Sequence, residues 1–134
     1  VSVDGTSNNI GWCYGPHWNP VAGAIRSFGR EAEVKTGWSA SGIASELIAG
    51  HPVIIWWVNG VWPAYNVSWY KNGKKINAVN SMHVQVVKGF TGTVESPLTF
   101  FVTDSGYGYP GRSYDVGTFM AKWGWFNNSA IVVK

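Results

Sequence analysis

Residues 81–89 read Ser-Met-His-Val-Gln-Val-Val-Lys-Gly, a short apolar run that ends at a glycine. Such a run predicts a buried strand. Successive side chains of a strand point to opposite faces, so His83, Gln85 and Val87 are expected to share one face. A polar side chain in a buried strand needs a hydrogen-bond partner or a function.

A second apolar run follows about fifteen residues later. It spans Leu98 to Thr103 and is followed directly by Asp104. If the two runs pair as neighbouring strands, the imidazole of His83 and the carboxylate of Asp104 lie side by side at one end of a sheet. The remaining question is whether the chain also supplies a nucleophile to this pair.

Length and composition indicate a single globular domain over residues 1–134. The chain is 46% hydrophobic and 13% charged, which is typical of a packed core and excludes disorder. Its nine Trp, six Tyr and six Phe exceed what a core of this size needs, so some are expected to line a surface groove or an interface. The net charge is +3, and the clustered Lys71, Lys74 and Lys75 suit a solvated hairpin tip better than a nucleic-acid site.

Cys13 is the only cysteine, which excludes disulfides and four-cysteine zinc sites within the chain. The three histidines have no acidic neighbours at ligand spacing, so no metal and no cofactor is expected. No apolar stretch reaches the roughly 18 residues that a membrane-spanning helix needs. Low charge, many Trp residues and loops rich in Gly, Asn and Ser favour a secreted or cell-surface protein. The oligomeric state is left open.

The remaining chain predicts three helices and several further strands. Asn19 is a good N-cap for a helix from Pro20 to Phe28, and Ser39 or Ser41 caps a second helix that ends before Gly50. Residues 52–58 predict a central strand, and Asn72-Gly73 predicts a hairpin turn. Residues 104–111 are rich in Gly and Tyr and predict a long loop. Asp115 caps a third helix, and Ala130–Val133 closes the chain as a strand. This order predicts an α+β fold, with a helical half packed on a mostly antiparallel sheet.

These landmarks, taken in order, resemble a known family. They are a first helix ending at Phe28-Gly29, a second helix running into Gly50-His51-Pro52 and an apolar strand, the His83 strand, the Asp104 strand and a Tyr/Gly loop. Phe119–Trp123 and the last strand complete the set. The chain resembles the papain-like cysteine peptidases of the bacteriocin-processing type, especially their stand-alone bacterial relatives, over roughly residues 8–134.

The resemblance implies a papain-like fold with a Cys–His–Asp site and a peptide or protein as substrate. Carried onto this sequence, the nucleophile is Cys13, the histidine is His83 and the acid is Asp104. A Gln or Asn side chain upstream of the cysteine would help to form the oxyanion hole, and Asn8 and Asn9 are the candidates. Cys13 stands about three residues earlier than the family pattern places it, beside Tyr14-Gly15-Pro16, so the nucleophile is either displaced or missing.

Each candidate also has a purely structural interpretation. A lone cysteine among aromatic residues is most often a small buried hydrophobe, and a lone strand histidine is usually a core residue with a satisfied hydrogen bond. Asp104 before Ser105-Gly106 could simply cap a loop. His17, Trp18 and Tyr107 could line a binding cleft, but His17 and Trp18 could equally staple the start of a helix.

Two functions therefore remain open. The first is a cysteine peptidase or related acyl-transfer enzyme that uses Cys13, His83 and Asp104. The second is a non-catalytic relative whose aromatic cleft binds a peptide, a glycan or a partner protein. The displaced cysteine, the missing upstream Gln and the surplus of Trp and Tyr motivate the second hypothesis, whereas Cys13, His83 and Asp104 motivate the first, which remains the leading one.

Overall fold

The computed structural model describes residues 14–59, 63–106 and 108–134. Over these residues the chain forms three α-helices, namely α1 (Trp18–Ser27), α2 (Ala40–Ile48) and α3 (Val116–Trp123), and one short 3-10 helix, η1 (Gly124–Phe126). The strands are β1 (Ala32–Lys35), β2 (Val53–Val58), β3 (Asn66–Lys71), β4 (Lys74–Val79), β5 (Met82–Gly92), β6 (Pro97–Asp104), β7 (Gly108–Asp115) and β8 (Ala130–Val133).

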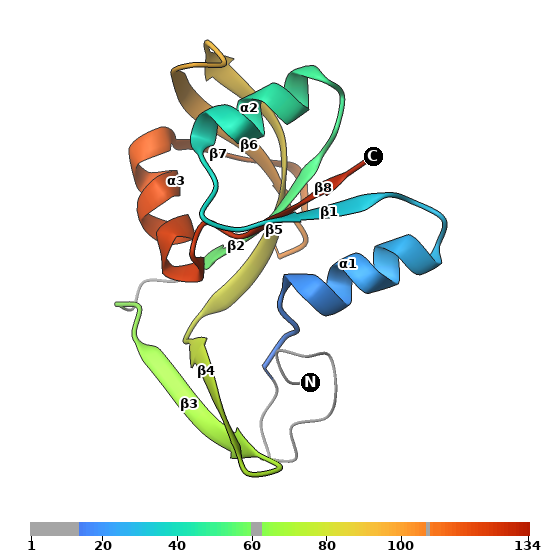
Figure 1. Ribbon diagram of the computed structural model, residues 1–134. Helices are drawn as coiled ribbons and strands as arrows, with labels where there is room; N and C mark the ends of the chain where they lie inside the picture. The colour runs from blue at the N-terminus through green and yellow to red at the C-terminus, as the bar shows by residue number, and fades with distance from the viewer. Residues whose placement is uncertain (1–13, 60–62, 107) are drawn as a thin grey trace.

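One antiparallel sheet organises the molecule. Its strand order is β1-β8-β2-β5-β6-β7, and β3 and β4 form a separate hairpin. Helices α2 and α3 lie on one side of the sheet and α1 on the other, while the hairpin projects from the end of the sheet where β5 begins (Figure 1). In the described part of the chain all strand pairings are antiparallel. The predicted α+β class, with helices packed on a mostly antiparallel sheet, is confirmed.

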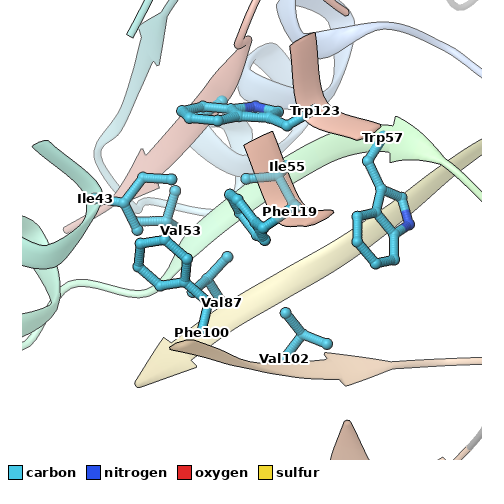
Figure 2. Packing of buried hydrophobic residues seen from close by; sticks show 10 residues of the cluster. Ile43, Val53, Ile55, Trp57, Val87, Phe100, Val102, Phe119 and Trp123 are labelled. Atoms are coloured by element: carbon cyan, nitrogen blue, oxygen red, sulfur yellow. The ribbon is translucent and has the colours of Figure 1, made fainter. Parts of the chain in front are cut away.

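The main core lies between the sheet and the pair α2 and α3. Phe119 and Trp123 of α3 and Ile43 of α2 meet fully buried residues of the sheet (Figure 2). The sheet residues of this cluster are Val53, Ile55, Trp57, Val87, Phe100, Val102 and Ala130. A second cluster, between α1 and the opposite face, includes Ala22, Trp56 and Ile131. The central strand β2 is thus buried on both faces, which explains its uninterrupted apolar sequence.

The helix ends follow local chemistry, with one exception. Ser39 caps α2 by accepting a hydrogen bond from the Gly42 N–H, and Asp115 caps α3 by accepting one from the Thr118 N–H. The predicted start of α1 is wrong, because the helix begins at Trp18 and its N-cap is His17, not Asn19. The ring of Trp18 packs edge-to-face on Trp56, a contact that the earlier start permits.

The predicted long loop over residues 104–111 is also wrong, since β7 already begins at Gly108. This strand lies at the edge of the sheet, where a proline without an N–H is tolerated. Its pairing with β6 is irregular between Val102 and Asp104. Gly111 has a φ of +92°, and a Cβ there would lie 2.2 Å from the Val102 carbonyl oxygen. Only glycine allows this close approach. Gly111, a residue type typical of loops, is therefore required here by a bulge in an edge strand.

Candidate active site

His83 and Asp104 meet at one end of the sheet. Strand β5 pairs with β6, and the Nε2 atom of His83 lies 2.7 Å from Oδ1 of Asp104. The carboxylate is fully buried, whereas 24% of the imidazole surface remains exposed. Trp57 stands directly opposite His83 in the neighbouring strand and is itself fully buried. The predicted adjacency of imidazole and carboxylate is therefore observed, with the imidazole open to solvent and the acid closed off from it.

Three donors from the described residues hold the Asp104 carboxylate. Besides His83, the backbone N–H of Gly106 donates to Oδ1 at 2.7 Å, and Nε2 of Gln85 donates to Oδ2 at 2.7 Å. Burial by itself raises the pKa of the Asp104 carboxyl group. The hydrogen bonds from His83, Gly106 and Gln85 outweigh burial, and the pKa lies below its ordinary value. Asp104 is therefore an ionised acceptor at neutral pH.

This arrangement determines the state of the imidazole. An ionised carboxylate can only accept hydrogen bonds, so the Nε2 atom of His83 must carry the proton that it donates. In the neutral ring the other nitrogen, Nδ1, is then the basic one. A histidine oriented in this way by a buried carboxylate can accept a proton from a thiol or hydroxyl placed beside Nδ1.

The segment that follows Cys13 in the sequence packs next to the start of β5. The Tyr14 hydroxyl donates to the Val79 carbonyl oxygen at 2.8 Å and accepts from the Val79 N–H at 3.1 Å. At Gly15, an added Cβ would come within 2.8 Å of the Met82 methyl group. Tyr14 and Gly15 are thus fixed against the residues that directly precede His83.

The sequence model of the peptidase C39-like family matches residues 2–131, nearly the whole chain. The chain belongs to the peptidase C39-like family. A similar solved structure is that of a candidate C39-like peptidase from Bacillus anthracis, with a TM-score of 0.75 and 19% sequence identity. The match covers 92% of this chain and 61% of the other, so the chain spans less than two thirds of that protein. No curated protein matches the chain significantly in sequence.

In this C39-like domain a cleft lies between the Tyr14–Gly15 segment and the start of β5. It has a volume of about 410 Å³ and adjoins a second hollow of about 550 Å³ that shares three of its residues. Among the described residues, no charged one lines either hollow. The lining residues are Tyr14, Gly15, Pro63, Ala64, Tyr65, Val67, Asn80, Ser81 and Met82.

His17 and Trp18 do not line this cleft, although the His17 ring meets the Tyr14 ring edge-on with centroids 5.9 Å apart. The rings of His17 and Trp18 stack with centroids 4.7 Å apart, and His17 also meets Phe126 edge-on. Burial lowers the pKa of His17 to about 4, so this imidazole is neutral at physiological pH. Both residues border a shallow groove of about 200 Å³, and among the described residues neither this groove nor the cleft at Tyr14 is lined by His83 or Asp104. His17 and Trp18 pack around the beginning of α1 and also contribute to this separate groove.

Four of the predicted site residues, Asn8, Asn9, Cys13 and Tyr107, lie outside the described residues. The sequence analysis assigned no role to Gln85. Its position on the same strand face as His83, as the only Gln of the chain, could have indicated that it belongs to the site. Among residues 14–59, 63–106 and 108–134, no three His, Cys, Asp or Glu side chains cluster as metal ligands would. Within the same residues no helix is long and apolar enough to cross a membrane.

Proposed function

We propose that this C39-like domain is a cysteine peptidase that hydrolyses peptide bonds through Cys13, His83 and Asp104. The observation that carries the proposal is the buried Asp104 carboxylate, which holds the Nε2–H of a partly exposed His83. Membership of a peptidase family adds support. A purely structural histidine has no need of an acid with two further donors, whereas a general base requires this orientation.

In this proposal the Cys13 thiol loses its proton to Nδ1 of His83 and attacks the carbonyl carbon of the substrate. The C–S bond forms, the C–N bond breaks, and His83 returns the proton to the leaving amine. Water then attacks the thioester and releases the carboxylic acid and the free thiol. Asp104 keeps the ring in the Nε2–H tautomer and stabilises its positive charge. The Asn8 or Asn9 amide would stabilise the oxyanion.

The uncharged cleft between Tyr14-Gly15 and Ser81-Met82 is the proposed place for the substrate. Its two sides directly follow Cys13 and directly precede His83 in the sequence. Its described lining consists of aromatic, aliphatic and small polar side chains without a charged one, so it suits a peptide segment with uncharged side chains. A peptide mixture analysed by mass spectrometry should show cleavage next to such residues.

The test of the chemistry is the pH dependence of Cys13 alkylation by iodoacetamide. A thiolate beside an imidazolium forms well below pH 7, whereas a free cysteine has a pKa of about 8.5. The wild type should therefore react rapidly at pH 6, and His83→Ala should move the rate profile to that of a free thiol. His51→Ala is the matched control, because His51 pairs with Glu46 on another part of the surface.

A wild-type profile centred near pH 8.5, together with no peptide cleavage, would overturn the proposal. It would favour the non-catalytic alternative. The groove lined by Trp18, Trp125 and three Asn side chains would support that alternative, because aromatic rings with amides can bind a peptide or a glycan. In that case the Cys13→Ala variant should still bind the peptide or glycan as the wild type does.

A further inference from the structure

Gln85 is the only glutamine in the chain, and in β5 it lies between the apolar residues Val84 and Val86. Its side chain is 1% exposed and occupies the same face of β5 as His83 and Val87. Its Nε2 atom donates to Oδ2 of Asp104, the carboxylate oxygen that does not bind His83. Gln85 therefore contacts the acid of the proposed site from the buried side.

The amide of Gln85 is only half satisfied. Its Oε1 atom is buried and has no hydrogen-bond partner among the described residues. An unpaired buried acceptor is destabilising, and an apolar side chain of the same size would avoid this penalty. Apolar packing around β5 thus gives no reason for a glutamine at this position, so the reason must lie with the buried Asp104 carboxylate. Among the described residues, the contact that distinguishes Gln85 from an apolar residue is the hydrogen bond to Asp104.

That hydrogen bond determines which way the carboxylate faces. Oδ1 accepts from His83 and from the Gly106 N–H, and Oδ2 accepts from Gln85. With donors on both oxygens, rotation about the Cβ–Cγ bond of Asp104 would break hydrogen bonds on both sides. Without Gln85, Oδ2 is a buried anionic oxygen that has lost this donor, and rotation becomes a way to find another one.

We infer that Gln85 is a positioning residue of the site, which locks Asp104 so that Asp104 in turn holds the Nε2–H tautomer of His83. The inference rests on the proposed peptidase function. It assigns to Gln85 no contact with the substrate or with the thiol. Its loss should therefore lower kcat and leave KM nearly unchanged.

The experiment compares Gln85→Met, which keeps the length of the side chain and removes the donor, with the wild type. Gln85→Asn is the second variant, since its shorter amide withdraws the donor from Asp104 and it decides the question if Gln85→Met does not fold. Val87→Ala is the control, because it loosens the same buried face of β5 and an aliphatic side chain has no hydrogen bond to Asp104 to lose. Two readouts are taken on each folded variant, namely peptide hydrolysis and the tautomer of His83. The tautomer is read from its ¹⁵N NMR signals in a Cys13→Ser background.

We expect kcat to fall about tenfold or more in both Gln85 variants with KM within about twofold, in line with the usual effect of residues that orient a reacting group. The Nε2–H tautomer should dominate in the parent chain and give way to a mixture of tautomers in the variants. Val87→Ala should keep both kcat and the tautomer.

Three results would overturn the inference. They are a Gln85 variant whose kcat stays within about twofold of the wild type, an unchanged tautomer, and a Val87→Ala variant that loses as much kcat as Gln85→Met. If the wild type itself cleaves no peptide, the proposed function fails, and the tautomer alone then decides whether Gln85 orients the pair. The two failures are therefore distinguishable.

Discussion

Replacing Tyr14 by phenylalanine tests how the segment before α1 is anchored. The ring of Tyr14 is buried against Trp69 and keeps its packing in the variant. Only the hydroxyl disappears, and with it the bonds to the Val79 carbonyl at 2.8 Å and to the Val79 N–H at 3.1 Å. Burial also raises the pKa of the Tyr14 hydroxyl, so it is neutral and makes both bonds throughout the physiological range.

The magnitude follows from those two bonds. Each hydrogen bond contributes about 1 kcal/mol, and a buried partner left unpaired adds to this, so the free energy of unfolding should fall by about 2–4 kcal/mol. This is a large share of the roughly 5–15 kcal/mol that stabilises a small domain. Because Tyr14 directly follows Cys13, the alkylation rate of the thiol at pH 6 should fall as well.

Urea unfolding followed by tryptophan fluorescence measures the first effect. Tyr70→Phe is the matched control, since Tyr70 is 69% exposed on β3 and the same change there should stay within about 0.5 kcal/mol. A Tyr14→Phe variant as stable as Tyr70→Phe would refute the reasoning that these two hydrogen bonds hold the segment to the hairpin.

Three further predictions concern the core, the acid and a helix cap. Phe119→Ala should lower the free energy of unfolding by about 3–5 kcal/mol, because Phe119 is fully buried against Phe100 and Trp123; a loss below about 1 kcal/mol in urea would contradict this. The pKa of Asp104 lies below its ordinary 3.8, so near this pH the folded state binds fewer protons than the unfolded state. The stability that this group contributes is therefore present above pH 3.8 and is lost as the pH falls through the folded-state pKa. Between pH 6 and pH 3 the urea midpoint should fall less for Asp104→Asn than for the wild type. An equal fall in both proteins would show that Asp104 does not contribute to the acid sensitivity. Ser39→Ala removes the cap of α2 and should destabilise by about 1 kcal/mol, measured as a shift in the urea midpoint; no shift would mean that the Gly42 N–H finds another acceptor.

Local patterns in the sequence determined most of the elements. The apolar runs predict β2, β5, β6 and β8, and Asn72-Gly73 predicts the hairpin turn, where both residues have positive φ angles. Asp115 and one of the two serine caps were also predicted correctly. These features depend on side-chain alternation, capping and turn geometry, which act within a few residues of the chain. The same reasoning predicted that His83 and Asp104 lie at the same end of the sheet.

The tertiary structure decided what joins distant parts of the chain. Tyr14 binds Val79, which is 65 residues away in sequence, and Gln85 reaches Asp104 across the pairing of β5 with β6. The loop-like sequence of β7 becomes a strand because the edge of the sheet tolerates proline and a bulge. Each of these contacts depends on strand register and on the order of strands in the sheet. A local sequence window carries neither, because both follow from how the whole chain packs.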